Sequence, residues 1–416
     1  MTSPPESDYS VITACRSCAS TELELVLDLG DMPLSDALVE PGTDRDTERL
    51  YPLTVVRCAD CSLVQILETV DPKVLFGDEY PYYSSFSDAL VEHARENVDQ
   101  IIGRTGVDES SLVVELASND GYLLQWFAKE GIPVLGIDPA PGPAAAARAR
   151  DIPTICEFFG PDLAERLAGE GRKADVIIGN NVLAHVPDQN TFVQAMSTLL
   201  APHGLVVMEF PYVRDLIDHG EFDTIYHEHH CYFSVTAVRS LFQRHGLHLV
   251  SVEHLDIHGG SLRVSFQRED NPDESVARFL DEEMESGLLT SDYYREFADR
   301  VDGIRSGLSS LLKGLLEDGA RVSAYAAAAK GAILLNYCGI GPESIEYVVD
   351  RNVHKHGLEM PGKAIGIAGP ERLLADPPDY LLILAWNFKD EIMQQQSGYA
   401  EQGGRFIIPI PRAEVV

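Results

Sequence analysis

Three histidines, one glutamate and two tyrosines stand together in the run Tyr226-His-Glu-His-His-Cys-Tyr-Phe233. A neutral imidazole near pH 7 is well matched to removing a moderately acidic C–H proton. Tyr226 or Tyr232 can then donate a hydrogen bond to the oxyanion that forms. The spacing differs from the H-E-x-x-H of zinc hydrolases, so we interpret the run as a proton-transfer site. The alternative is a set of histidines that only bond backbone atoms at a domain boundary.

The direction of the side chains decides which histidine is the base. In an extended stretch alternate side chains share a face, so His227 and His229 are expected to point one way and Glu228 and His230 the other. Only one of these faces can be catalytic, and the spacing alone leaves that choice open.

Two C-x-x-C pairs near the N-terminus predict a structural zinc site. Cys15 with Cys18, and Cys58 with Cys61, each offer two thiolates from one tight turn, and two such turns close a tetrahedral shell. Four sulfur ligands leave no position for a substrate, so zinc is expected to replace a core that residues 11–80 are too short and polar to build. Two unrelated cysteine pairs or a redox dithiol are the alternative.

A polar turn follows the first buried strand of the middle region and indicates a cofactor site. The sequence Val113-Val-Glu-Leu-Ala-Ser-Asn-Asp-Gly-Tyr122 opens directly into a helix, where backbone amides face a ligand. It has a single glycine and is therefore not the G-x-G-x-x-G pyrophosphate fingerprint. Glu115 and Asp120 instead suit a cationic ligand with an amino acid tail, which favours S-adenosylmethionine over NAD. Ala117 and Asn119 of the same turn are expected to line the cofactor.

Two later strand ends complete the predicted cofactor site. Asp138 ends the second strand and can accept hydrogen bonds from both ribose hydroxyls. Asn180, Asn181 and His185 follow a later strand, at the position where methyltransferases contact the methionine end. Any α/β protein has Gly and Asp at strand ends, so each of these signals alone is weak. Only the three strand ends together, in this order along the chain, favour a methyltransferase.

A second alternating series of strands and helices supplies a candidate substrate site. Small residues precede Lys330, which at a helix N-terminus can neutralise a diphosphate. Trp386 and Asn387 follow a later strand of the same series and can stack on and hydrogen-bond a base. Arg351 and Arg214 are further candidate cations near the diphosphate. A dinucleotide-type fold without a ligand is the alternative.

The elements that must position these residues follow from the apolar runs. Residues 11–80 are expected to form short strands and turns, and 86–103 a helix. Buried strands that alternate with helices predict a doubly wound sheet, with strands at 112–116, 133–137, 174–178, 205–210, 247–256 and 261–267. A polar linker is expected at 268–275, then a long charged helix or helix pair to about residue 317. The second series has its strands at 321–326, 344–349, 380–385 and 405–408.

The composition is that of a large acidic globular protein. The 416 residues allow two or three domains, and 45% hydrophobic with 24% charged residues is close to the globular average. A formal net charge of −34 disfavours binding to nucleic acid or to anionic lipid. No apolar run approaches the roughly 20 residues of a membrane span, and the N-terminus has no apolar signal core, so we expect a cytoplasmic protein.

Taken in order along the chain, these motifs resemble the S-adenosylmethionine-dependent sugar C-methyltransferases, which act on dTDP-linked ketodeoxysugars in antibiotic pathways. The likeness covers nearly the whole chain. It rests on the cysteine pairs, Tyr80-Pro-Tyr-Tyr-Ser-Ser85, the 115–121 turn, Tyr226-His-Glu-His229 and Ala324-Tyr-Ala-Ala-Ala-Ala-Lys-Gly331. It implies a zinc-bearing N-terminal domain, a central methyltransferase domain and a C-terminal Rossmann-like domain that helps to hold the nucleotide-sugar.

The resemblance also implies roles for single residues. It makes His229 the base and places Tyr226 and Glu228 in the sugar pocket. A tyrosine of the 80–83 run joins them, with Tyr80 or Tyr82 near the reacting oxygens and Tyr83 as a further substrate contact. One departure is Ala117, where the family turn often has glycine.

We therefore expect an α/β protein with a zinc module at 1–85, a methyltransferase domain at 86–270 and a Rossmann-like nucleotide-sugar-binding domain at 271–416. The expected reaction moves a methyl group from S-adenosylmethionine to the carbon next to the C4 ketone of a dTDP-4-ketodeoxysugar. C3 is preferred over C5, and a monomer is expected. Sugar O- or N-methylation, or a non-catalytic or NAD-linked nucleotide-binding protein, are the alternatives.

Overall fold

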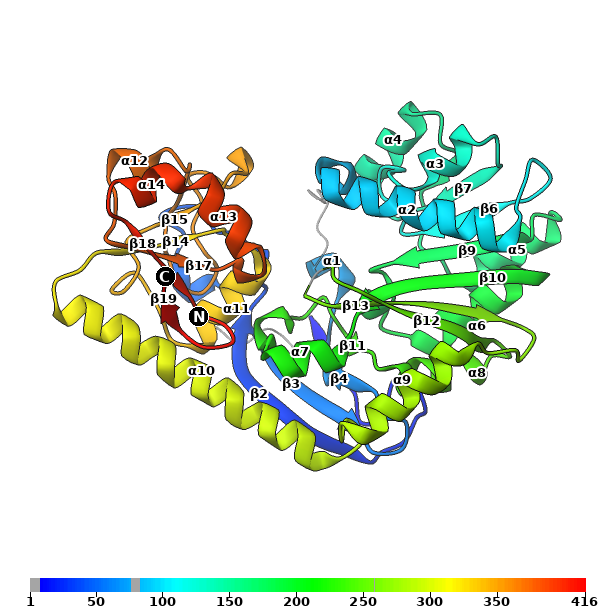
Figure 1. Cartoon of the computed structure of the whole chain (residues 1–416), viewed down its shortest axis with the longest axis horizontal. Coiled ribbons are helices and arrows are strands. Elements are labelled where there is room, and N and C mark those ends of the chain that lie inside the picture. Colours follow the sequence, from blue (N-terminus) through cyan, green and yellow to red (C-terminus); the bar gives the residue numbers. More distant parts are fainter. Residues whose placement is uncertain (1–7, 76–82, 258) are drawn as a thin grey trace.

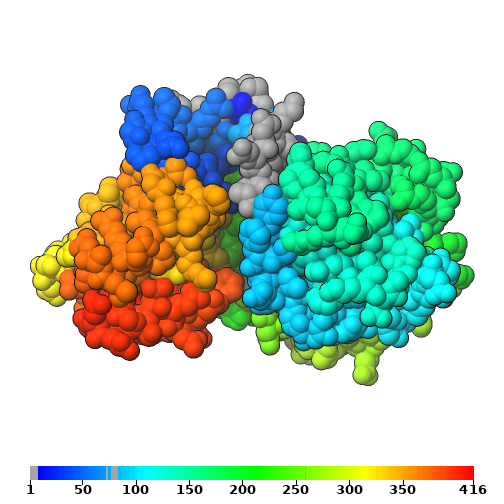
Figure 2. All heavy atoms as spheres, turned by 90° about the horizontal axis from the view of Figure 1, so that it is seen from above, coloured from blue at the N-terminus to red at the C-terminus, as the bar shows by residue number. Residues whose placement is uncertain are grey.

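The computed structural model describes residues 8–75, 83–257 and 259–416. Three units meet at a central junction: an N-terminal cysteine-bearing module, a central α/β unit and a C-terminal α/β unit (Figure 1). Figure 2 shows a groove between the C-terminal unit, in orange and red, and the central unit, in cyan and teal. None of the helices in the described ranges has the length and apolarity that crossing a membrane requires.

The central unit is a seven-stranded sheet with the order β12-β13-β10-β9-β6-β7-β8. Its strands are β6 (Val113–Leu116), β7 (Val134–Ile137), β8 (Thr154–Ile155), β9 (Ala174–Asn180), β10 (Leu200–Pro211), β12 (His248–Leu255) and β13 (Ser261–Gln267). Strands β8, β7, β6, β9 and β10 are parallel, and β13 runs antiparallel between β10 and β12. The six strands predicted for this region are confirmed, and their parallel core places the ends of β6, β7 and β9 at one edge.

Helices cover both faces of this sheet (Figure 1). They are α2 (Asp88–Thr105), α3 (Leu124–Lys129), α4 (Pro141–Ala149), α5 (Pro161–Gly169), α6 (Gln189–Leu199), α8 (Val235–Gln243) and α9 (Glu274–Glu285), whereas α7 (Val213–His219) packs in the core that the N-terminal module shares with the C-terminal unit. Helix α2, expected at 86–103, shows why the sequence folds this way. The Ser87 side chain caps it by accepting from the Leu90 amide, and its buried stripe of Leu90, Ala94, Val98 and Ile101 has helical spacing.

Residues 268–273, within the stretch predicted as a linker, connect β13 to α9 without helix or strand, and α9 packs on the central unit. The Arg268 guanidinium donates to the Ser197 carbonyl at 2.6 Å, and Phe279 is buried in the core of the central unit. Glu283, fully buried, accepts from the amides of Val235 and Thr236 and so caps α8. Arg268 and Ser275, at the two ends of this stretch, bond to the central unit.

The N-terminal module contains β1 (Tyr9–Val11), β2 (Leu23–Pro33), β3 (Leu50–Cys58), β4 (Val64–Ile66) and β5 (Glu68–Val70), with a short α1 (Pro72–Leu75). The expectation of short strands is wrong for β2 and β3, which form a long antiparallel hairpin. Buried side chains of this hairpin, such as Leu27 and Leu53, share one core with the C-terminal unit, whereas the cysteines join the core of the central unit. The apolar side chains of the module are therefore buried in cores that it shares with the C-terminal unit and the central unit.

The C-terminal unit begins after α10 (Ser291–Glu317), the long helix in yellow at the bottom of Figure 1. Its sheet order is β16-β15-β14-β17-β18-β19, with β14 (Val322–Tyr325), β15 (Val348–Val349), β16 (Ile367–Ala368), β17 (Tyr380–Ile383), β18 (Arg405–Ile408) and β19 (Glu414–Val415). Its helices are α11 (Ala329–Tyr337), α12 (Arg372–Ala375), α13 (Lys389–Gln395) and α14 (Ser397–Glu401). The four predicted strands and the predicted helix pair α9 and α10 are confirmed.

Candidate active site

The histidine run lies where the three units meet. Just before it, η4 (Phe222–Thr224) packs on α11 of the C-terminal unit, and Phe222 contacts Tyr337 with ring centroids 5.1 Å apart. Just after it, β11 (Cys231–Tyr232) pairs with β4 of the N-terminal module. One short segment therefore connects all three units and brings its side chains to their common boundary.

The run bends, so the prediction that His227 and His229 share a face by strand alternation is wrong. The His229 amide donates to the Tyr226 carbonyl at 2.9 Å, which closes a turn in place of an extended stretch. The His227 ring turns to the N-terminal module, where Nε2 lies 3.0 Å from the Pro52 carbonyl oxygen. Its other side faces Tyr51 edge-on, so His227 is a buried packing residue.

His229 has the arrangement that a base requires. Its Nδ1 lies 3.1 Å from the Thr224 carbonyl oxygen. A carbonyl can only accept, so Nδ1 carries the proton and Nε2 keeps its lone pair. Burial, and then the neighbouring His185, hold the pKa of His229 well below its usual value, so the ring is neutral at pH 7.

The structure brings His229 against a residue of the predicted cofactor site. His185 ends the turn η3 (Leu183–His185) that follows β9, and its ring meets the His229 ring edge-on at 4.7 Å. Burial lowers the pKa of His185 to about 4, so it is neutral as well. Tyr226 contacts the same His229 ring with centroids 4.2 Å apart. The candidate base thus lies beside the carboxyl end of β9.

The turn after β6 has the tight geometry of a cofactor loop. Ala117 and Asn119 both adopt left-handed backbone conformations, with φ of 54° and 50°. The Asp138 carboxylate accepts from the amides of Asn119 and Ala140, both at 2.8 Å, and so ties the end of β7 to this turn. Asp138 therefore already has two partners, although its carboxylate retains further lone pairs for a ribose.

The side chains around this turn fit S-adenosylmethionine. Near this turn and the end of β9, four buried oxygens that can accept a hydrogen bond have no partner among the described residues: Glu115 Oε2, Ser118 Oγ, Asp120 Oδ1 and Asn180 Oδ1. Such groups are costly unless a ligand satisfies them. Burial, and then Asp138 and Asp120, raise the pKa of Glu115 well above its usual value. A cationic donor-rich ligand would relieve both costs. Asn181 lies at the same edge, where its amide donates to the Glu209 carbonyl at 2.8 Å.

Asn119 and Asp120 also hold the segment that follows the tyrosine run. The Ser84 amide donates to Asn119 Oδ1 at 2.9 Å, and the Ser85 hydroxyl donates to Asp120. Tyr83 packs near the start of α4, where a Cβ on Gly142 would lie 2.8 Å from the Tyr83 hydroxyl.

The predicted residues Tyr80 and Tyr82 lie outside the described residues.

The carboxyl group of Glu228 is expected to exchange its proton near neutral pH. Burial, and then the charge of Asp36 from the N-terminal module, raise the pKa of Glu228 to about 7. A carboxyl group with that pKa is protonated in a large fraction of molecules at pH 7 and can donate a hydrogen bond.

The predicted substrate residues of the C-terminal unit come together, but they face carboxylates. Lys330 Nζ donates to Asn387 Oδ1 at 2.9 Å and lies 4.8 Å from the centre of the Trp386 ring. The Trp386 indole is only 9% exposed and donates to Asp223 at 2.8 Å. A base could stack on this ring only if the side chains that cover the ring moved away.

Glu221 and Asp223 belong to the same cluster. Burial raises the pKa of Glu221 to about 8 and that of Asp223 to about 6, and Lys330 acts against both shifts. Neither carboxylate was among the residues predicted from the sequence. They stand just before Tyr226, but only the fold brings Lys330 to them.

The two predicted arginines have different surroundings. Arg351 is exposed, and Arg214 pairs with Asp218 at 3.6 Å and with Glu282 at 3.4 Å. Arg214 lines a separate hollow of about 530 Å³ that also contains Tyr212 and His254.

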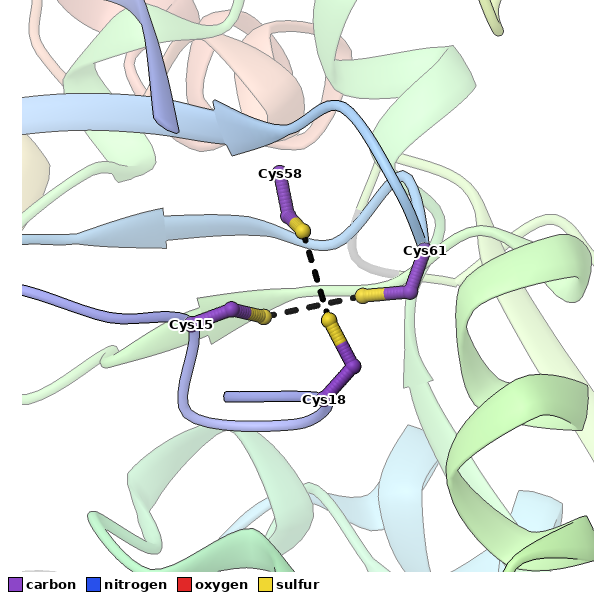
Figure 3. Close-up of side chains that lie close together, drawn as sticks. All are labelled: Cys15, Cys18, Cys58 and Cys61. Carbon is purple, nitrogen blue, oxygen red and sulfur yellow. Dashed lines mark hydrogen bonds between the residues drawn. The ribbon is translucent and has the colours of Figure 1, made fainter. Parts of the chain in front are cut away.

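The four cysteines form a zinc site (Figure 3). Their sulfurs all lie within 4.8 Å of one another, with Cys15 and Cys61 3.6 Å apart and Cys18 and Cys58 3.4 Å apart. A tetrahedral zinc with bonds of about 2.3 Å separates its sulfurs by about 3.8 Å, so the group fits.

The two zinc knuckles have the same backbone shape. Ala19 and Ser62, each one residue past the second cysteine, have φ of 60° and 61°. Strand β2 follows the first knuckle and pairs with β3, starting at Leu23 opposite Cys58, and this pairing brings the two knuckles together across the long insert.

Comparison with known proteins gives three matches to family models. "Putative zinc binding domain" matches residues 15–76, "Methyltransferase domain" residues 90–252 and "C-methyltransferase C-terminal domain" residues 256–411. The C-methyltransferase NovU of Streptomyces niveus is 38% identical over 410 residues, which cover 97% of this chain and 97% of that protein.

Two further relatives match a shorter part of the chain. A ubiquinone biosynthesis O-methyltransferase of Azorhizobium caulinodans is 26% identical over 118 residues, covering 26% of this chain and 47% of that protein. The 1,6-didemethyltoxoflavin-N1-methyltransferase structure of Burkholderia thailandensis is 16% identical with a TM-score of 0.36, covering 51% of this chain and 97% of that one.

Proposed function

The chain belongs to the C-methyltransferase family, and we propose that it methylates C3, next to the C4 ketone, of a dTDP-linked 4-ketodeoxysugar. It is an S-adenosylmethionine-dependent C-methyltransferase with a four-cysteine zinc site. The substrate class and the position of the methyl group are the parts we add.

The observation that carries the proposal is the tautomer of His229. Methyl transfer to carbon needs a carbanion equivalent, and a carbon beside a ketone becomes one when a base removes its proton. The Thr224 carbonyl keeps the proton of His229 on Nδ1 and leaves Nε2 free to take the substrate proton. The contact with His185 places this nitrogen's ring at the carboxyl end of β9, beside the predicted methionine end of the cofactor site.

Neighbouring groups have the properties needed to stabilise the enolate. The Tyr226 ring is tilted by 34° against the His229 ring, with centroids 4.2 Å apart, and Glu228 with a pKa of about 7 can act as a donor to a sugar oxygen. Burial raises the pKa of Tyr232 well above its usual value, so this phenol stays protonated. When bound, S-adenosylmethionine supplies the electrophilic methyl group, and Glu115, Asp120, Asp138 and Asn180 would hold it.

We assign the nucleotide part of the substrate to the C-terminal unit. Lys330, Trp386 and Asn387 form one cluster at the junction, and Arg351 offers an exposed guanidinium on the same unit. For Lys330 to neutralise a diphosphate, its attraction to Glu221 and Asp223 must weaken, which their raised pKa values favour because protonated carboxyls no longer compete.

Deuterium exchange tests the proposed base directly. In D2O without S-adenosylmethionine, the wild type should exchange the C3 hydrogen of a dTDP-4-keto-2,6-dideoxysugar, and His229→Asn should lose this exchange by at least about a hundredfold. Binding of S-adenosylhomocysteine should be nearly unchanged in the variant. His203→Asn, at an exposed position far from the run in sequence, is the control.

Two outcomes would contradict the proposal. Exchange at the wild-type rate in His229→Asn would remove His229 as the base. Methylation of a sugar oxygen or nitrogen without any carbon exchange would instead support the alternative chemistry, and the mass and position of the methyl group identify it.

A further inference from the structure

The first zinc knuckle contacts the central unit next to the turn that carries His185. Asn190 lies in α6, a few residues after that turn, and its side-chain amide donates to the carbonyls of Arg16 and Ser17, both at 2.8 Å. These two residues stand between the zinc ligands Cys15 and Cys18. His245 Nε2 lies 3.0 Å from Asn190 Oδ1 and so fixes which way the amide points.

Arg16 makes a second connection from the same knuckle. Its guanidinium donates to the Pro187 carbonyl at 3.3 Å, just past η3, and to Thr69 Oγ1 at 2.7 Å inside the N-terminal module. Its backbone amide donates to Gln65 Oε1 at 2.9 Å. One side chain therefore joins the knuckle, the module's sheet and the exit of the His185 turn.

The histidine run makes a third connection to this turn. The His230 amide donates to the carbonyl of Ala184, the residue before His185, at 2.7 Å. The His230 carbonyl in turn accepts from the Ile66 amide of β4 at 3.1 Å. Inside the turn, Gln189 donates to the carbonyls of Leu183 and Val186 at 2.9 and 2.6 Å. A three-residue 3-10 turn has little stability of its own, so these external bonds set its position.

We propose that the first zinc knuckle holds the His185 turn in its catalytic position, with Arg16 and Asn190 as positioning residues. The metal fixes the shape of the knuckle, the knuckle's carbonyls fix Asn190 and α6, and the turn lies between α6 and the histidine run. The inference rests on the proposed placement of His185 at the methionine end of the cofactor. It makes the zinc a support for methyl transfer, in addition to its role in folding.

Asn190→Ala tests this connection without touching a metal ligand or a cofactor residue. Asn336→Ala is the matched control, because Asn336 is also half-buried and its amide also donates to two carbonyls, those of Ala332 and Pro361, at 2.8 and 2.9 Å. Both variants are expected to keep their zinc and to lose similar thermal stability. Only Asn190→Ala should weaken S-adenosylhomocysteine binding severalfold and lower kcat on the order of tenfold, with KM for the sugar little changed.

A spectroscopic measurement keeps the test independent of the variants' stability. Cobalt(II) in the four-cysteine site absorbs visible light, and its bands report the geometry of the sulfurs. Adding S-adenosylhomocysteine to the cobalt-loaded wild type should shift these bands, and the shift should be reduced in Asn190→Ala but not in Asn336→Ala.

The outcomes separate this inference from the proposed reaction. Neither cofactor binding nor the cobalt bands involve the sugar or proton removal by His229, so both readouts hold even if the methyl acceptor is a different molecule. The proposal would be overturned if the two variants bound S-adenosylhomocysteine with equal affinity. It would also be overturned if adding S-adenosylhomocysteine to the wild type left the cobalt bands unchanged. The knuckle would then only dock one unit on another.

Discussion

A single backbone carbonyl determines which nitrogen of His229 carries the proton. The Thr224 oxygen can only accept, so it fixes the proton on Nδ1 and leaves Nε2 as the free lone pair. His227, two residues away, has its Nε2 on the Pro52 carbonyl, and its remaining nitrogen, Nδ1, is buried inside the protein. The difference between two histidines of one run therefore comes from the backbone atoms around them, which the spacing of the run does not specify.

Ala117 is a second residue whose backbone matters more than its side chain. Its φ of 54° is a conformation that costs an L-residue with a Cβ about 1 kcal/mol relative to glycine. Ala117→Gly removes that cost but makes the unfolded chain more flexible, so we expect a gain in the free energy of unfolding of at most about 1 kcal/mol. Closer approach of the backbone should also tighten S-adenosylhomocysteine binding a few-fold, as measured by calorimetry.

Ala364→Gly is the matched control for this change. Ala364 has a φ of 52°, but it is exposed in the C-terminal unit. Its replacement should change stability in the same direction and leave cofactor affinity as in the wild type. Looser cofactor binding in Ala117→Gly would show that the Cβ packs usefully against the ligand.

At the scale of elements, the segment from Glu221 to His230 contains carboxyl groups whose pKa values are raised and histidines whose pKa values are lowered. Burial raises the pKa of Glu221 to about 8 and of Glu228 to about 7, so the folded protein holds protons that the unfolded chain releases near pH 4.5. Burial lowers the pKa of His227 to about 4 and of His230 to about 3. The carboxyls therefore cost stability as pH rises from about 4.5 to about 8, and the histidines cost stability as pH falls below about 6.5.

Glu221→Gln isolates one of these titrations. Above about pH 7.5 the histidines are largely neutral in both states, so within this segment only the carboxyls make the free energy of unfolding fall as pH rises toward 8. Removing the Glu221 carboxyl should reduce the slope of the free energy of unfolding against pH. The reduction is at most the contribution of one proton, about 1.4 kcal/mol per pH unit. Denaturant unfolding of the ligand-free protein across this pH range measures it. Glu165→Gln, at an exposed position, should leave the slope unchanged, and an unchanged slope in Glu221→Gln would contradict the assignment.

Elements with a local signal were predictable from the sequence, and elements fixed by distant partners were not. Strands β6, β7, β9 and β10 are runs of buried apolar residues, and the periodicity of such runs locates them. The two-residue strand β11 exists only because β4 lies beside it. The turn at Tyr226 to His229 and the position of α9 on the central unit likewise depend on contacts across the chain.

The candidate site shows the same division. Residue types identified the four cysteines, whose sulfurs the structure brings together, and the contact between His229 and His185 joins two predicted residues. The neighbours of Lys330 were beyond prediction, because Glu221 and Asp223 reach it only through the packing of two units. A helix N-terminus with a lysine predicts an anion site. The fold brings two carboxyl groups to this lysine, and the sequence around Lys330 gives no sign of them.

At the scale of the whole molecule, the proposed reaction centre lies where three units meet (Figure 1). The N-terminal module contacts the His185 turn, the central unit supplies the cofactor loop, and the C-terminal unit places Lys330 and Trp386 against η4. The core that joins β2 and β3 to the C-terminal unit is continuous, so these units hold each other in place. This arrangement explains why no single unit contains all the groups that methyl transfer to a nucleotide-sugar would need.

The net charge of −34 gives a last prediction, because the proposed substrate is itself an anion. Lys330 lies among carboxyls, so neither the whole molecule nor this cluster offers a strongly positive field at low salt. Raising the ionic strength from about 0.01 M to about 0.15 M shortens the Debye length from about 30 to about 8 Å and screens the long-range repulsion. The Kd of the dTDP-sugar should therefore fall over this range. S-adenosylhomocysteine, which has no net charge, should bind almost equally throughout. Steady weakening of dTDP-sugar binding as salt is added would show that local cations such as Arg351 outweigh the charge of the whole protein.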